Sequence, residues 1–152
     1  MTSGSPRGSA SPGQEIEARI PNRLDELAKI VLVVDSFGAA HRIPAAIVND
    51  LNLALDEVLN NIVSYGYPNA DNAEITVRLR HEAGRVRVEI EDDGIAFNPL
   101  APRRRETAAR RPRRRVGGLG IRFIRGLMDE VAYERIDGRN RLRLTRRIPE
   151  VS

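Results

Sequence analysis

Residue types on which several functional classes depend are missing from this chain, or nearly so. Cysteine is absent, which excludes disulfide bonds, thiolate catalysis and cysteine metal sites. Of the 25 basic residues, Lys29 is the one lysine. It lies in a helical pattern rather than in a Gly-Lys-Ser/Thr loop, so a P-loop NTPase is excluded. No apolar run approaches the ~18 residues of a membrane-spanning helix.

The composition suits one domain with one core. The chain has 152 residues, 41% of them hydrophobic, which is enough for a sizeable core. Residues 1–13 are rich in Ser, Gly and Pro and are expected to form a disordered tail. They contain no hydrophobic stretch typical of a signal peptide, so we expect a cytoplasmic protein whose domain occupies residues 14–150.

Hydrophobic periodicity predicts a mixture of strands and helices. Strands are expected at residues 14–20, 74–81, 85–91, 131–136 and 142–147. Helices are expected at residues 22–37, 44–65 and 119–129, the first of them capped by Asn22 and closed by Gly38. Most strands are joined as hairpins without regular βαβ alternation. The predicted fold class is therefore α+β, an α/β sandwich with a mostly antiparallel mixed sheet and helices on one face.

The second predicted helix carries a polar stripe on an otherwise largely apolar segment. At about 100° per residue, Glu57, Asn60, Asn61 and Ser64 fall within roughly a third of a turn. Burying a carboxylate and two amides costs several kcal/mol unless they are paired or bind a ligand. One interpretation is a solvated outer face, and the other is a ligand site. Leu53 extends the same stripe and makes the face less solvent-like.

Two glycine-containing segments follow at wide spacing. Asp92 and Gly94 lie where a predicted strand ends, and an ordinary turn would use the same residue types. Residues 117–120, Gly-Gly-Leu-Gly, precede the third predicted helix, where a flexible hinge is the simpler interpretation. The alternative is a phosphate site, because glycines free the backbone N–H groups and a helix N-terminus favours anions.

In this order, the three segments resemble the ATP site of the GHKL (histidine-kinase-like) ATPase superfamily. More narrowly, they are similar to the anti-sigma-factor serine kinases of bacterial partner-switching systems. Residues 56–61 with 65–67 resemble the N-box, and residues 92–99 resemble the Asp-x-Gly-x-Gly segment. Residues 117–131 resemble the glycine box and its helix, including the Met-Asp-Glu at its end. The resemblance covers roughly residues 15–147 and implies a Bergerat-type ATP-binding fold.

The resemblance implies a role for each matching residue of the N-box. Glu57 would be the general base, and Asn61 would hold Mg²⁺ through its amide oxygen. A hard cation prefers oxygen ligands and bridges phosphates. Tyr65 stands where a histidine is common in these kinases.

The glycine segments would bind the nucleotide itself. By resemblance, Asp92 accepts a hydrogen bond from the adenine amino group, and Gly94 lets the backbone approach the base. Ala96 stands where a second glycine is usual. The residues expected to contact phosphate are Gly118, Leu119 and Gly120.

Residues 98–117 correspond to the ATP lid and are dense in arginine. Eight arginines lie between Arg103 and Arg115. Such a charge run is typical of a solvated or disordered segment. It is also suited to gathering the triphosphate, docking an acidic partner or holding nucleic acid. An aromatic content of 4% disfavours nucleic acid, because no stacking platform is evident.

The resemblance implies an ATP- and Mg²⁺-dependent serine kinase. It would phosphorylate a serine of a STAS-type antagonist, sequester a sigma factor or similar regulator, and form a homodimer. A non-catalytic module that binds nucleotide and sequesters a partner is the first alternative. An arginine-rich nucleic-acid binder is the second. A complete sensor histidine kinase is not expected, because the sequence shows no pattern of a sensor or phosphoacceptor-helix domain. His41 and His81 lie outside any dimerisation-helix pattern, so a histidine phosphoacceptor is not expected either.

Overall fold

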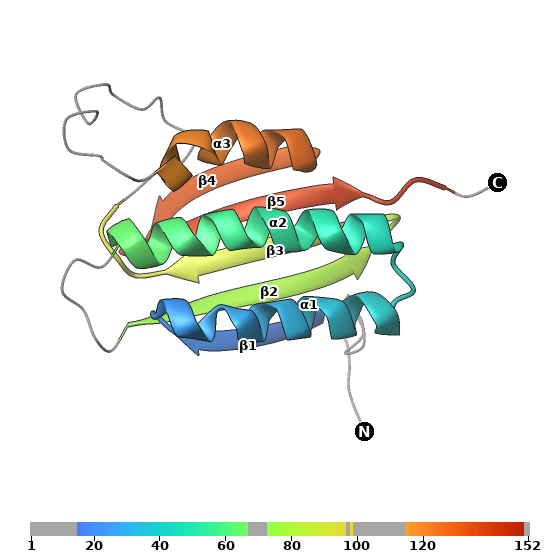
Figure 1. Cartoon of the computed structure of the whole chain (residues 1–152), viewed down its shortest axis with the longest axis horizontal. Coiled ribbons are helices and arrows are strands. Elements are labelled where there is room, and N and C mark those ends of the chain that lie inside the picture. Colours follow the sequence, from blue (N-terminus) through green and yellow to red (C-terminus); the bar gives the residue numbers. More distant parts are fainter. Residues whose placement is uncertain (1–14, 67–72, 97, 99–114, 151–152) are drawn as a thin grey trace.

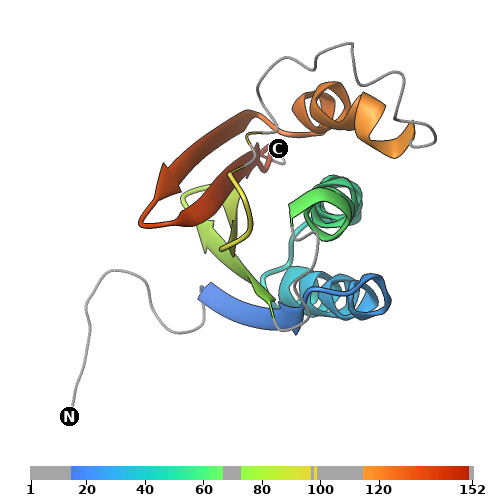
Figure 2. The same ribbon diagram turned by 90° about the vertical axis from the view of Figure 1, so that its left-hand side faces the viewer.

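The chain forms one sheet that is covered on a single face by helices (Figures 1 and 2). A computed structural model describes residues 15–66, 73–96, 98 and 115–150. In chain order the elements are β1 (Glu15–Pro21), the 3₁₀ turn η2 (Leu24–Glu26), α1 (Ala28–Ala40), α2 (Ala45–Asn61), the π-helical turn η3 (Ile62–Gly66), β2 (Glu74–Glu82), β3 (Arg85–Asp92), α3 (Arg115–Leu127), β4 (Glu130–Ile136) and β5 (Arg139–Arg147).

The five strands lie in the order β1-β2-β3-β5-β4. All four pairings between them are antiparallel, which confirms the predicted α+β class. The described strands contain no parallel pair, although the prediction allowed for a mixed sheet. The β3–β5 register places Asp92 directly opposite Asn140.

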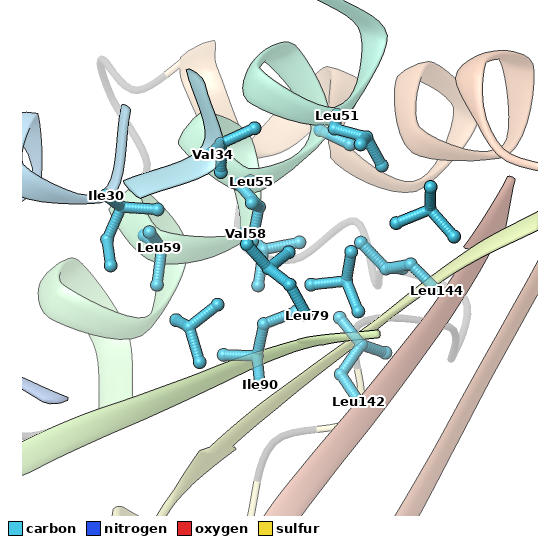
Figure 3. Close-up of a cluster of buried hydrophobic side chains, with 14 of the residues drawn as sticks. Ile30, Val34, Leu51, Leu55, Val58, Leu59, Leu79, Ile90, Leu142 and Leu144 are labelled. Carbon is cyan, nitrogen blue, oxygen red and sulfur yellow. The ribbon is translucent and has the colours of Figure 1, made fainter. Parts of the chain in front are cut away.

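The core lies between the sheet and the three helices, with α2 contributing the most buried side chains. On α2 the buried side chains include Leu51, Leu55 and Val58, spaced three and four residues apart as an amphipathic helix requires. They face inward strand residues such as Ile90 and Leu142 (Figure 3). This packing holds α2 across the middle of the sheet. The polar residues of α2 lie outside the apolar face that packs on the strands.

The first helix differs from the prediction at both ends. Asn22 does not cap it, because η2 separates Asn22 from the first residue of α1, Ala28. The Asn22 backbone N–H donates to the Ala73 carbonyl at 3.0 Å and extends the β1–β2 pairing. The helix α1 begins after η2 and continues through Gly38 to Ala40. Gly38 therefore does not end the helix. A Cβ there would lie 2.5 Å from Cγ2 of Val48 on α2, so the glycine permits close helix packing.

Two elements near the C-terminus begin earlier than predicted. The helix α3 starts at Arg115 rather than at Leu119. The strand β5 starts at Arg139 because a two-residue turn, Asp137-Gly138, joins it to β4. These residues have φ of 48° and 76°. Positive φ at both positions is what a two-residue type I′ turn requires, and the twist of this turn matches the right-handed twist of the strands.

The sheet face opposite the helices carries paired charges. Arg78 contacts Glu17, Glu89 and Glu91, and Arg141 contacts Glu89 and Glu91. Burial alone would raise the pKa of the Glu91 carboxyl, but hydrogen bonds from Arg141 and Arg78 hold it below its usual range. These ion pairs keep the open face polar. Among the described residues, no helix is both long and apolar enough to cross a membrane.

Candidate nucleotide-binding site

The three segments singled out in the sequence meet at one end of the molecule. The C-terminal end of α2, the end of β3 and the start of α3 all lie on the left in Figure 1. The antiparallel β3–β5 pairing also places the start of β5 at this end, beside the end of β3. The segments are far apart in the chain, so the fold itself brings them together.

Glu57, Asn61 and Gly120 form a close contact between two of these segments, α2 and α3. Glu57 and Asn61 lie one turn apart on α2, and Asn61 Nδ2 donates to Glu57 Oε2 at 3.4 Å. Asn61 is buried, with 5% of its surface exposed, and Glu57 is partly buried. A Cβ on Gly120 would lie 3.2 Å from Glu57 Oε2 and 3.4 Å from Asn61 Nδ2. The absent side chain lets α3 approach the carboxylate and amide closely.

Asp92 is held by the turn that follows it and by the neighbouring strand. Its side chain is buried, with 5% exposed. Asp92 Oδ1 accepts hydrogen bonds from the Gly94 backbone N–H at 2.8 Å and from Asn140 Nδ2 at 3.0 Å. Asp92 can therefore belong to an ordinary turn and to a ligand site at the same time. Its carboxylate closes the turn and also lies at the end of the sheet where the three segments meet.

Asn140 is a site residue that the sequence did not identify. The sequence pattern predicts a loop at this position and a strand that begins at Leu142. In the structure Asn140 is the first inward-facing residue of β5, buried at 6% exposure. The alternation of Asn140 with Leu142 and Leu144 is the signal that would have revealed it.

The remaining stripe residues of α2 do not join the contact. Asn60 Nδ2 donates to the Asp56 backbone carbonyl and to Asp56 Oδ1 at 2.7 and 3.2 Å, and Ser64 is exposed. The stripe therefore divides into a solvated part and a part against α3. The side chain of Tyr65 lies outside the described residues.

The residues expected to contact phosphate lie inside α3 rather than ahead of it. In a helix that begins at Arg115, the four N–H groups that lack intrahelical partners are those of the capping residue and of the first three helical residues, ending at Gly117. Gly118, Leu119 and Gly120 come after them. Ala96 is exposed, as is its neighbour Ile95. Apart from Asn98 and residues 115–117, the predicted lid lies outside the described residues.

The Met-Asp-Glu segment, residues 128–130, stabilises the core and the β4–β5 end of the sheet. Met128 is buried in the core. The Asp129 backbone N–H donates to the Thr145 carbonyl at 2.7 Å, and Asp129 Oδ2 accepts from the Arg147 N–H at 2.6 Å. The segment thereby anchors the start of β4 to the end of β5. Its described contacts lie within the sheet and core, away from Glu57.

A hollow of about 350 Å³ is lined in part by Asp92 but mainly by residues of the opposite face of the sheet. Most of its lining side chains, such as Arg78 and Glu91, belong to the charged face opposite the helices. Glu57, Asn61 and Gly120 do not line it. The hollow therefore belongs to the ion-paired face, and the contact between α2 and α3 defines the candidate site. The lining residues are Arg19, Ala73, Glu74, Thr76, Arg78, Glu91, Asp92, Asp93 and Arg139.

A single protein ligand, the amide oxygen of Asn61, is suited to a Mg²⁺ ion whose other ligands are nucleotide phosphates and waters. The described residues contain no group of three or more His, Cys, Asp or Glu able to hold a metal. Mg²⁺ rarely needs one, because it keeps several waters and binds through few protein oxygens plus substrate phosphates. The Asn61 amide nitrogen donates to Glu57, so its oxygen is the atom that would serve as a ligand to a hard cation.

The chain matches the model of the histidine kinase-like ATPase domain over residues 20–146. It is 37% identical over 95 residues to the serine/threonine-protein kinase BtrW of Bordetella bronchiseptica, covering 62% of this chain and 67% of that protein. It is 32% identical over 89 residues to the serine-protein kinase RsbW of Listeria monocytogenes, covering 55% of this chain and 56% of that protein.

The fold also resembles a solved structure. The RsbU and RsbW domains of a Mycobacterium tuberculosis protein match with a TM-score of 0.62 at 15% identity, over 88% of this chain and 32% of that one. At this identity the likeness concerns the fold alone. Together with the family match over most of its length, these findings show that the chain belongs to the histidine kinase-like ATPase family.

Proposed function

We propose that this protein is a regulatory serine kinase that transfers the γ-phosphate of Mg²⁺-bound ATP to a protein serine. The observation that carries the proposal is the approach of Gly120 to Glu57 and Asn61. The Glu57 carboxylate and the Asn61 side-chain amide are thereby kept beside the glycine segment of α3, at the end where Asp92 lies. The names of the two kinase relatives support the same activity.

Each residue has one task in this proposal. Glu57 accepts the proton of the attacking serine hydroxyl as its oxygen bonds to the γ-phosphorus and the bond to ADP breaks. Asn61 holds Mg²⁺ through its amide oxygen, and the bound ion neutralises charge on the phosphates. Asp92 and Gly94 bind adenine, with Ala96 beside them. Gly118, Leu119 and Gly120, in the first turns of α3, lie beside the phosphates.

The proposed substrate is a serine of a STAS-type antagonist protein. The proposed second partner is a sigma factor or similar regulator that the kinase sequesters, and the proposed assembly is a homodimer. These partners rest on the resemblance of the three segments to anti-sigma-factor kinases. The aligned regions cover 67% and 56% of the two relatives, so each partner requires its own binding measurement.

The test is phosphotransfer from γ-labelled ATP to a STAS protein, with Glu57→Gln as the variant. We expect the variant to bind ATP within about threefold of wild type and to lose transfer by about 10²–10⁴-fold, the usual contribution of a general base. Asp56→Asn is the matched control, since Asp56 is the neighbouring, exposed carboxylate of the same helix and should leave transfer unchanged.

Two results would contradict the kinase proposal. Transfer that persists in Glu57→Gln would remove the base from that residue. Tight ATP binding without any phosphoserine on the STAS protein would favour the non-catalytic module, which uses nucleotide as a switch and acts by sequestration.

A further inference from the structure

A network of four side chains surrounds the start of β5, opposite the end of β3. The Asn140 amide donates from Nδ2 to Asp92 Oδ1 at 3.0 Å and to the Ile95 carbonyl at 2.8 Å. Its Oδ1 accepts from the Tyr133 hydroxyl and from Arg135 Nη1, the latter at 3.1 Å. Both hydrogens and both lone pairs of one buried amide are thus engaged.

The partners allow one orientation of this amide. A guanidinium can donate but not accept, so the oxygen of Asn140 must face Arg135. The nitrogen must then face Asp92, whose carboxylate accepts. A flipped amide would oppose donor to donor at Arg135 and acceptor to acceptor at Asp92. Tyr133 and Arg135, both on β4, therefore determine that Asn140 on β5 directs its amide nitrogen, and not its oxygen, toward Asp92 at the end of β3.

The same network holds the turn after β3 from two sides. Arg135 Nη1 also donates to the Gly94 carbonyl at 2.9 Å, and Asn140 holds the Ile95 carbonyl. Asp92 Oδ1 receives donors from the Gly94 backbone and from Asn140. The carboxylate is therefore fixed in its plane and kept as an acceptor rather than left to rotate.

From this geometry we propose that Asn140 is the positioning residue that makes Asp92 selective for a purine bearing a 6-amino group. The inference rests on the proposed binding of adenine at Asp92. A fixed carboxylate acceptor accepts a hydrogen bond from the amino group of adenine but opposes the 6-oxo group of guanine or hypoxanthine. Asn140 acts through Asp92 and does not touch the base.

The burial of Asn140 argues against a purely structural role. Its inward neighbours on β5, Leu142 and Leu144, are core hydrophobes, and a third hydrophobe at this position would have continued the core. An amide costs free energy when buried and is retained where its hydrogen bonds specify an arrangement. Here the specified arrangement is that of Asp92 and the Gly94 turn.

The test combines a variant with a modified ligand. Asn140→Leu keeps the size of the side chain and removes its donor. Calorimetric titration would compare ATP with purine riboside triphosphate, which is ATP without the 6-amino group. We expect the variant to lose at least tenfold in affinity for ATP and to stay within twofold of wild type for the analogue. Asn52→Leu is the matched control, because it breaks an Asn–Asp hydrogen bond between α2 and α1.

Equal losses for both ligands would assign Asn140 a structural role and overturn the inference, as would unchanged affinity for ATP. If Asn140→Leu does not fold, Tyr133→Phe decides the question, because it removes one donor to the amide oxygen. A roughly threefold loss confined to ATP supports the inference, and no such loss overturns it. Failure of the wild type to bind ATP would instead overturn the proposed function.

Discussion

At the scale of single residues, the contact of Gly120 with the Glu57 carboxylate limits what position 120 can carry. The site of a Gly120 Cβ lies 3.2 Å from Glu57 Oε2, slightly inside ordinary contact. A substitution would displace the carboxylate by a few tenths of an ångström rather than unfold the helix. Position 120 therefore tests whether the placement of Glu57 matters.

We predict that Gly120→Ala lowers phosphotransfer roughly tenfold while ATP affinity changes less. The reason is that small displacements of a reacting group cost rate steeply. Labelled-phosphate transfer and calorimetry measure the two effects separately.

Gly126→Ala is the matched control on the same helix, since a Cβ there meets nothing within 4 Å. It should leave transfer unchanged and favour α3 by up to about 1 kcal/mol through helix propensity. Equal transfer rates in the two variants would show that Gly120 is not needed for the placement of Glu57.

At the scale of elements, Gly38 controls the distance between α1 and α2. We predict that Gly38→Ala lowers the free energy of unfolding by about 1–3 kcal/mol, the usual cost of overpacking, because its Cβ would lie 2.5 Å from Val48 Cγ2. Urea unfolding measures this loss. The double variant with Val48→Ala should recover part of it, and failure to recover would place the cost elsewhere than this contact.

A histidine pair connects the end of α1 to β2. His41 Nδ1 and His81 Nδ1 lie 3.3 Å apart. Burial and the nearby His41 lower the pKa of His81 below its ordinary value of 6.5. The unfolded chain therefore binds this proton more readily than the folded one. The stabilising effect is complete above pH 6.5 and is lost as the pH falls toward the folded-state pKa.

We predict that the free energy of unfolding decreases between pH 7.5 and pH 5.5, as measured by urea unfolding at each pH. His81→Gln should flatten this dependence, because glutamine does not titrate. The same slope in the variant would assign the pH dependence to another group.

At the scale of the whole molecule, the site joins α2, β3, β5 and α3, so nucleotide binding should stabilise the entire fold. We predict that Mg²⁺ and ADP at a hundred times the dissociation constant stabilise the protein by about 2.7 kcal/mol, seen as a rise of several degrees in Tm. Asp92→Ala should abolish most of the rise. Asp93→Ala, the exposed neighbour, should retain it, and equal loss in both would argue against adenine binding at Asp92.

Local periodicity accounts for the predictions that agree with the structure. Glu57 and Asn61 are four residues apart in a segment with a clear helical pattern, and that spacing alone places them on one face. Strand alternation similarly predicted β2 and β3 to within one residue. The starts of α3 and β5 were less predictable, because glycines and a two-residue turn left the boundaries open.

The sequence by itself determined the elements, their hairpin connections and the residues of the three segments, since each depends on neighbours a few positions away. Only the tertiary structure decided that Gly120 approaches Glu57 and that Asn140 holds Asp92. These partners are separated by 63 and 48 residues. Such contacts depend on how α2 and α3 pack on the sheet and on the β3–β5 register, which the whole core sets together.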